Sequence, residues 1–190
     1  MSKIKIEVSA RHCHISRKDL DKLFGKGYKL TVYKELSQPG QFAAEETLIV
    51  KTKGGKIENM RILGPVRKNT QIEISATDAR ILKINPPVNL SGNLRGSSGA
   101  ILVGLRGTLK LKKGIIIAKR HLHCNKKQAL ELGIKKGQKV SVKTLGDRSV
   151  TFHNILVRVR EDFDLSIHID TDEGNASLAG GICAEGEIIK

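Results

Sequence analysis

The chain carries one short motif twice, as Arg11-His12-Cys13-His14 and again as Arg120-His121-Leu122-His123. Four of the six histidines in the 190-residue sequence lie in these two copies. In an extended strand, residues i and i+2 point to the same face, so each copy aims two imidazoles at one point. A single copy is a weak signal, because histidines on strands often only face solvent. Two copies predict a pair of strands that each present metal ligands.

Similar segments flank both copies of the motif. An alternating apolar strand precedes each copy, and a helix-like stretch follows each after Ser16 or Asn125, which are good N-cap residues. A strand then opens after a glycine turn. The matched segments are 4–8 with 115–118, 17–25 with 126–133, 27–32 with 137–142, 62–67 with 155–160, and 73–78 with 168–172. The sequence therefore predicts an internal repeat.

Each half of the repeat offers one further side chain that can bind a metal. Glu73 and His168 fall at equivalent places near the end of the two halves. The six predicted ligands are His12, His14, Glu73, His121, His123 and His168. Such a set suits two Zn²⁺ ions, or Co²⁺ or another divalent metal. The alternative is a duplicated fold in which the histidines are incidental.

The composition indicates a mostly β protein built of two small barrels or sandwiches with short helices. Aromatic residues make up only 3% of the chain, there is no Trp, and 19 glycines separate short runs of Ile, Leu and Val. We expect a first domain at about 1–90 and a second at about 100–190. The stretch 86–99 is either the linker between them or, with its glycines and Arg95, a loop that contacts phosphate.

Several classes of protein are disfavoured by the sequence. No apolar run approaches the length of a membrane span, and no signal peptide precedes Ile4. The net charge of +15 suggests a polyanionic partner, but no aromatic residues are interleaved for stacking on nucleic acid. Cys13, Cys124 and Cys183 lack CxxC spacing, so a reducing cytoplasm is expected. Strand alternation should turn the Cys13 sulfur away from the metal, as a structural group.

The chain closely resembles the PduL-type phosphotransacylases, or phosphate propanoyltransferases, over nearly its whole length. The most specific matching segments are 8–14, 64–67, 70–75, 120–123 and 168–176. The resemblance implies two β-barrel domains with a two-metal site, usually zinc, at their interface. It also implies transfer of an acyl group between coenzyme A and inorganic phosphate. The chain departs from the family at Ala10, where Asn is frequent, and at Cys13, where an aliphatic residue is usual.

The resemblance also assigns roles to single residues. By motif position, the family's metal ligands fall on the same six residues that the repeat singles out. The phosphate-contacting arginine falls on Arg67, and the coenzyme A contacts fall on Ser9, Lys34, Arg61, Leu63 and Asn175. Some relatives carry an N-terminal extension that directs them into bacterial microcompartments. Because the first strand begins by Ile4, we expect cytoplasmic residence, with association with a microcompartment left open.

The expected reaction depends mainly on managing negative charge. Phosphate is already an anionic nucleophile, so no strong base is needed, whereas an oxyanion and a thiolate must both be stabilised. Zinc suits the coenzyme A sulfur, and the paired donors of a guanidinium suit phosphate, so Arg67 is the predicted catalytic residue. The structural alternative for Arg67 is a surface ion pair. Asp78, Asp170 and Asp172 either orient imidazoles or cap turns.

Two other functions compete with the acyltransferase. A zinc hydrolase that acts on a phosphoester or acyl bond would use the same six ligands. A nucleic-acid-binding protein would use the basic charge, but for the reason given above we expect no nucleic-acid partner and no membrane partner. The expected partners are acyl-CoA or CoA with phosphate or acyl phosphate. The sequence leaves open the acyl chain, acetyl or propanoyl, the native metal, the direction of the reaction and whether a homodimer forms.

Overall fold

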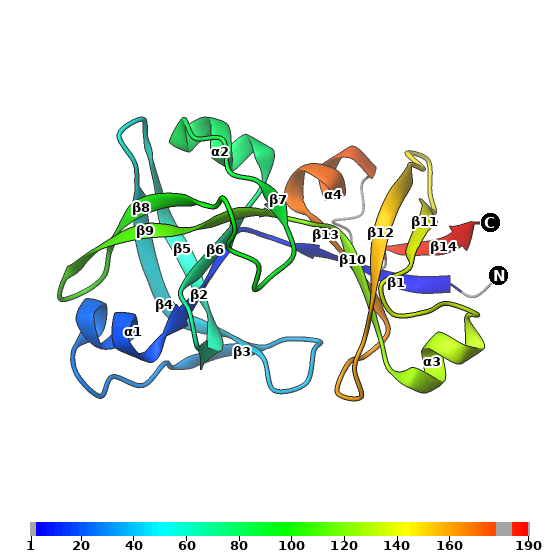
Figure 1. Cartoon of the computed structure of the whole chain (residues 1–190), viewed down its shortest axis with the longest axis horizontal. Coiled ribbons are helices and arrows are strands. Elements are labelled where there is room, and N and C mark those ends of the chain that lie inside the picture. The colour runs from blue at the N-terminus through cyan, green and yellow to red at the C-terminus, as the bar shows by residue number, and fades with distance from the viewer. Residues whose placement is uncertain (1–2, 178–183, 190) are drawn as a thin grey trace. The chain divides into compact units, whose positions relative to one another are not determined.

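The computed structural model describes residues 3–177 and 184–189, which form two compact units. The split unit combines Met1–Ala10 with Lys119–Lys190, and the continuous unit runs from Arg11 to Ala118. Cys183 lies outside the described residues. Across the described ranges, no helix has the length and apolar character needed to cross a bilayer. Figure 1 shows the elements of each unit.

The continuous unit is a closed six-stranded barrel. Its strands pair in the order β4, β5, β2, β6, β9 and β8, and β8 pairs back to β4, while β3 and β7 extend the sheet. Its strands are β2 (His12–Ser16), β3 (Val32–Glu35), β4 (Phe42–Lys51), β5 (Lys56–Arg67), β6 (Gln71–Ile74), β7 (Val88–Asn89), β8 (Ser98–Val103) and β9 (Thr108–Ala118). Its helices are α1 (Arg17–Phe24) and α2 (Ala76–Leu82).

The split unit is a second closed six-stranded barrel, with strand order β1, β13, β10, β12, β11 and β14. Its strands are β1 (Lys3–Ser9), β10 (His121–Cys124), β11 (Lys139–Thr144), β12 (Thr151–Val159), β13 (Ser166–Asp170) and β14 (Glu185–Ile189). Its helices are α3 (Lys126–Glu131) and α4 (Thr171–Ser177). The fold predicted from sequence, two small barrels with short helices, is therefore confirmed.

The two halves of the repeat exchange their first strands. β1 precedes the first His-x-His motif in the chain but pairs with β13 of the second half (Figure 1). The end of β9 precedes the second motif but pairs with β6 of the first half. The compact units therefore differ from the expected domains at 1–90 and 100–190. The stretch 86–99 also lies inside the continuous unit and is not a linker between the units.

Alternation along the strands places histidines outside each barrel and apolar side chains inside. Cys13 lies between the two histidines of β2, and Cys124 is the last residue of β10. Each is fully buried in the hydrophobic core of its own barrel. Burial, with the nearby charge of Asp19, raises the pKa of the Cys13 thiol well above its usual range. The Cys13 sulfur thus lies in the core, on the face opposite to its neighbouring imidazoles, as pleating predicts.

The structure confirms both helix caps and corrects two details of the repeat. The Ser16 side chain accepts a hydrogen bond from the backbone N–H of Asp19, and Asn125 does the same for Gln128. The strand expected at 27–32 is wrong, because β3 begins only at Val32. The match of 62–67 with 155–160 is shifted by two residues. Cys13 pairs with Ile62 and Leu122 pairs with Val157, so Ile62 corresponds to Val157.

Candidate active site

The first cluster consists of His12, His14 and Glu73, and it lies in the continuous unit. β2 supplies both histidines, and antiparallel pairing places Glu73 of β6 directly opposite His12. The two Nε2 atoms are 3.2 Å apart, and Glu73 Oε1 lies 3.8 Å from that of His12 and 3.7 Å from that of His14. All three side chains are buried. Three potential ligand atoms therefore converge on one point.

Hydrogen bonds and charges around the first cluster orient the Glu73 side chain and keep it as a carboxylate. The buried Gln71 amide donates to Glu73 Oε1 at 2.6 Å and to Ser91 Oγ at 3.0 Å, and its own oxygen accepts from the backbone N–H of Gly92. Burial alone would raise the pKa of Glu73, but the charge and hydrogen bond of His12 lower it overall. Burial, His12 and Arg67 together lower the pKa of His14. The cluster thus combines a carboxylate with an unprotonated imidazole.

The second cluster consists of His121, His123 and His168, and it lies in the split unit. β10 supplies the first two, and His168 of β13 pairs directly with His121, as Glu73 pairs with His12. The ring centroids are 4.5 Å apart for His121 and His123, 5.1 Å for His121 and His168, and 4.7 Å for His123 and His168. The equivalence of Glu73 and His168 predicted from the repeat is confirmed.

Hydrogen bonding in the second cluster fits a metal. His121 Nδ1 lies 2.9 Å from the Lys119 carbonyl oxygen, which can only accept, so the proton is on Nδ1 and Nε2 is left as the ligand nitrogen. Both ring nitrogens of the buried His123 lack a hydrogen-bond partner. Burial, followed by the charges of His121 and His168, lowers the pKa of His123 to about 2. A buried, neutral imidazole without a partner is suited to a metal ion, because burying it unpaired is otherwise costly.

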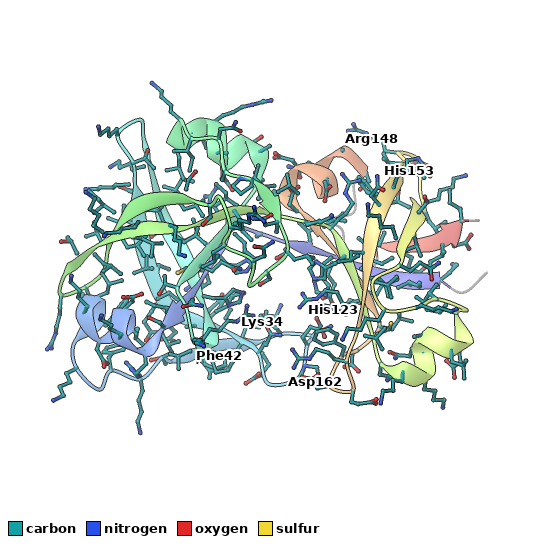
Figure 2. The ribbon with its side chains drawn as sticks, viewed as in Figure 1. Lys34, Phe42, His123, Arg148, His153 and Asp162 are labelled. Carbon is teal, nitrogen blue, oxygen red and sulfur yellow. The ribbon has the colours of Figure 1, made fainter. Side chains whose placement is uncertain are left out.

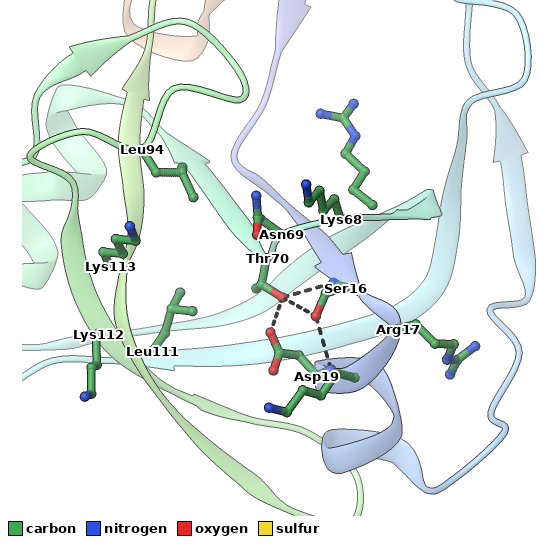
Figure 3. Close-up of a pocket in the computed structure, with 12 residues that line it drawn as sticks. Ser16, Arg17, Asp19, Lys68, Asn69, Thr70, Leu94, Leu111, Lys112 and Lys113 are labelled. Atoms are coloured by element: carbon green, nitrogen blue, oxygen red, sulfur yellow. Dashed lines mark hydrogen bonds between the residues drawn. The ribbon is translucent and has the colours of Figure 1, made fainter.

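Arg67 lies at the end of β5 beside a basic cavity in the continuous unit. Its guanidinium donates to Ser91 Oγ at 3.1 Å and to Gln41 Oε1 at 3.4 Å. The cavity has a volume of about 540 Å³ (Figure 3). It is lined by Ser16, Arg17, Lys18, Asp19, Arg67, Lys68, Asn69, Thr70, Leu94, Leu111, Lys112 and Lys113. Six cations against one carboxylate make this a region that attracts anions.

The cavity floor is ordered by a small hydrogen-bonded group. The Thr70 hydroxyl donates to Asp19 and accepts from the backbone N–H of Ser16 (Figure 3). These hydrogen bonds hold the Asp19 side chain against the cavity wall. Lys68, Lys112 and Lys113 are exposed around it. The positive charge of the cavity therefore comes mainly from side chains that are open to solvent.

Three of the residues assigned to coenzyme A lie on the same face of the continuous unit as the first cluster. Arg61 pairs directly with His12, and Leu63 pairs with His14. Lys34 pairs with Ala43, which in turn pairs with Leu63, so one row across the sheet runs from Lys34 to His14. Lys34 lies next to Phe42 in Figure 2. The register thus brings these three residues together with the candidate metal ligands.

The other two residues that the resemblance assigns to coenzyme A lie in the split unit. Ser9 ends β1 and pairs with Asp170 of β13. Asn175 lies on α4, and Gly174 beside it approaches the Val8 side chain so closely that a Cβ there would be 2.5 Å from a methyl carbon. α4 therefore packs against β1 near Ser9.

The aspartates considered as partners of the imidazoles act at helix starts. Asp78 forms a capping box with Ser75 and an ion pair with Arg11 at 2.8 Å. Asp170 Oδ1 accepts from the backbone N–H of Glu173, and the Glu173 carboxylate accepts from that of Asp170. The capping alternative is confirmed for both. Asp172 lies in the first turn of α4.

Comparison with known proteins gives the family. A sequence model described as phosphate propanoyltransferase matches residues 5–180. The chain belongs to the phosphate propanoyltransferase family. It is 53% identical over 177 residues to the phosphate propanoyltransferase of Thermotoga maritima, covering 92% of this chain and 84% of the relative. It is 49% identical over 175 residues to that of Lachnoclostridium phytofermentans, covering 92% and 82%. Membership makes this protein a phosphate acyltransferase and does not favour the hydrolase alternative.

Sequence reasoning missed four side chains that shape the two clusters. Gln71 and Ser91 support Glu73, Gln41 contacts Arg67, and Glu7 lies beside His168. Gln71 could have been found, because it lies two residues before Glu73 on a predicted strand and so shares its face. Ser91 and Gln41 come from irregular segments, and no periodicity places such residues.

Proposed function

We propose that this protein interconverts a short-chain acyl-CoA and phosphate with acyl phosphate and CoA, using one divalent metal ion in each cluster. The observation that supports this most strongly is the repetition of one geometry. In each barrel a His-x-His strand pairs with a strand that brings a third ligand opposite the first histidine. Incidental histidines would not require ligand-type side chains at the equivalent position of both barrels.

The donor sets suit zinc or another borderline metal. Nitrogen from imidazole and oxygen from carboxylate are ligands for Zn²⁺ and Co²⁺, and in each cluster three such side chains converge on one point. His12, His14 and Glu73 would hold one ion, and His121, His123 and His168 the other. When bound, such ions supply Lewis acidity and stabilise thiolate and oxyanion charge.

The protein's own charged side chains bind and orient the two substrates. Arg67, which lines the basic cavity, presents paired N–H donors to phosphate. Ser91 and Gln41 accept bonds from its guanidinium and so limit its orientations. Arg61 and Lys34 provide positive charge for the phosphates of coenzyme A, and Leu63 provides apolar surface. In the split unit, Ser9 and Asn175 are the polar residues that the resemblance assigns to coenzyme A.

The reaction needs no strong base from the protein. A phosphate oxygen forms a bond to the thioester carbonyl carbon, the carbon–sulfur bond breaks, and the electron pair leaves with sulfur as the coenzyme A thiolate. Arg67 offsets the charge of the nucleophile and holds it near the carbonyl, which contributes through orientation and electrostatics. Acetyl and propanoyl groups differ by one methylene, which gives little discrimination, so both are proposed substrates.

Metal analysis combined with a phosphate-dependent assay tests this proposal. Purified protein should contain about two equivalents of metal per chain, and CoA release from acetyl-CoA or propanoyl-CoA should require phosphate and yield acyl phosphate. Arg148→Ala, which removes an exposed arginine outside both clusters, is the matched charge control and should behave as wild type. CoA release at the same rate without phosphate would instead indicate a hydrolase.

A further inference from the structure

We propose that Glu7 is a fourth protein ligand of the metal in the second cluster, supplying a carboxylate oxygen from the side of His168. This inference rests on the proposed function, because it requires a metal in that cluster. Glu7 Oε2 lies 3.7 Å from His168 Nε2. Ligand atoms roughly 2.0–2.2 Å from a tetrahedral zinc are about 3.3–3.6 Å apart. The observed separation is therefore close to that of two ligands of one ion.

The strand register places Glu7 in line with the second cluster. Glu7 of β1 pairs directly with His168 of β13, and His168 pairs with His121 of β10. The three side chains form one row across three neighbouring strands. Ile4 and Ile6 of β1 are buried in the barrel core, so Glu7 points outward on the same face as the imidazoles. Its side chain is only 17% exposed, against 14% for His168.

The first cluster provides an internal comparison for this distance. There Glu73 Oε1 lies 3.8 and 3.7 Å from the imidazole nitrogens of His12 and His14, which matches the separation of Glu7 from His168. The corresponding row in the continuous unit is His12, Glu73 and Ile116. The position of Glu7 is thus occupied there by an apolar residue. Each row contains one carboxylate, at the centre in the first cluster and at the edge in the second.

The different position of the carboxylate in the two rows has an electrostatic consequence. Three neutral imidazoles alone would leave the full double charge of a divalent ion in a largely buried place, which is costly. In the first cluster Glu73 reduces that charge by one. If Glu7 binds, both clusters neutralise the same share of the metal charge, although their third ligands differ. The strand exchange is what makes this arrangement available, because β1 brings Glu7 from the first half of the repeat to His168 of the second.

The competing interpretation is that Glu7 serves only as the ion-pair partner of Lys5. Lys5 Nζ lies 2.6 Å from Glu7 Oε1, and its side chain is 63% exposed. The two contacts use different carboxylate oxygens, so the ion pair leaves Oε2 directed at His168. An exposed pair of this kind contributes roughly 0–1 kcal/mol, which corresponds to at most about fivefold in an equilibrium. Removal of Lys5 therefore isolates the ion pair from the carboxylate.

The test measures metal affinity of the second cluster alone. In the full chain with His12→Gln and His14→Gln, the first cluster is removed, and Zn²⁺ affinity is measured by competition with a chromophoric chelator. Adding Glu7→Gln should weaken binding by at least about tenfold, within the 10- to 100-fold range of groups that support a metal site. The visible absorption bands of bound Co²⁺ should also shift. Lys5→Gln, the matched control, should change affinity at most about fivefold and leave the Co²⁺ spectrum unchanged.

The outcomes separate this inference from the function on which it rests. If Glu7→Gln changes affinity no more than Lys5→Gln and leaves the Co²⁺ spectrum unchanged, Glu7 is not a ligand, and the three-histidine site stands without it. If the protein with an intact second cluster binds no metal, both the Glu7 inference and the proposed second metal are wrong. Because Glu7 lies outside the barrel core and Gln has nearly the same shape, the variant should keep the wild-type circular dichroism spectrum.

Discussion

In the first cluster the third side chain is the carboxylate of Glu73, whereas in the second it is the imidazole of His168. Both are positioned in the same way, by a strand that pairs opposite the first histidine of the motif. The residues that surround the two clusters are less alike. The first cluster lies near Arg67 and a basic cavity, and a glutamine orients its carboxylate. The second lies against Phe163, with a ring separation of 3.9 Å from His123.

The two halves of the repeat therefore share the positions of the three candidate ligands but differ in the residues around them. The residues of the continuous unit that we propose for phosphate and coenzyme A share a face with the first cluster, in adjacent rows of the sheet. The second cluster holds an imidazole whose nitrogens both lack partners. We therefore expect the two clusters to respond equally to loss of a ligand, but differently to changes in what surrounds them.

The largest effect should come from removing one ligand of either cluster. His12→Ala and His123→Ala should each lower turnover by more than about a hundredfold, which exceeds the effect typical of groups that only support a ligand. Each should also lose about one metal equivalent per chain, as measured by elemental analysis. The Arg148→Ala control should keep both. Two metal equivalents with wild-type turnover in both variants would contradict the two-metal proposal.

Arg67→Ala should affect phosphate use and leave the metal in place. Loss of a guanidinium that stabilises charge typically costs on the order of a hundred- to a thousandfold in turnover. Steady-state kinetics with varied phosphate should show this loss, while metal content stays at the wild-type value. Arg67→Lys keeps the charge without the paired donors and should recover only part of the activity. An unchanged phosphate dependence in Arg67→Ala would make Arg67 a purely structural residue.

Gln71→Leu should weaken metal binding in the first cluster only. Gln71 orients Glu73 by a 2.6 Å hydrogen bond, and loss of such a support typically reduces metal affinity by about 10- to 100-fold. Titration with Zn²⁺ against a chelator should show one weakened and one unchanged site. Equal weakening of both sites would mean that the substitution disturbs the whole fold, and unchanged binding would show that Gln71 does not orient Glu73.

Much of this architecture could be predicted from sequence, for physical reasons that also explain the errors. The alternation around His12 and His14 has a period of two, so it predicts both the strand and the burial of Cys13. The equivalence of Glu73 and His168 follows from counting along the repeat. The exchange of β1 and β9 could not be predicted, because each alternating strand would fit either barrel. For the same reason Glu7 could not be associated with His168.

Acid should destabilise the metal-free protein through its buried histidines. The pKa values of His14 and His123 are lowered in the folded state, so between their folded values and about 6.5 the unfolded chain binds more protons. Stability is therefore full above about pH 6.5 and is lost as the pH falls below it. The slope should reach about 1.4 kcal/mol per pH unit for each such histidine. The lowered pKa of Glu73 acts only below about pH 4.3.

Urea unfolding of the metal-free protein between pH 5 and 7.5 measures this slope. His123→Gln should reduce it, because the variant removes one of the buried imidazoles. His153→Gln is the matched control. His153 is exposed, forms a hydrogen bond with Ser141 and lies away from His123 in the same unit, so its replacement leaves the buried imidazoles in place (Figure 2). Equal slopes in wild type and His123→Gln would show that His123 does not contribute to the acid sensitivity.

The smallest effect should come from the two buried cysteines, one in each barrel core, although Cys13 corresponds in register to Leu122 and not to Cys124. Cys13 and Cys124 are both 0% exposed and lie in the two separate cores. Cys13→Ala and Cys124→Ala should each cost about 1–2 kcal/mol of stability, as small deletions in a core do, and should leave metal stoichiometry and turnover unchanged. Chemical unfolding and elemental analysis test this. Loss of one metal equivalent in folded Cys13→Ala would show that its sulfur is a ligand, which the strand geometry of His-x-His does not permit.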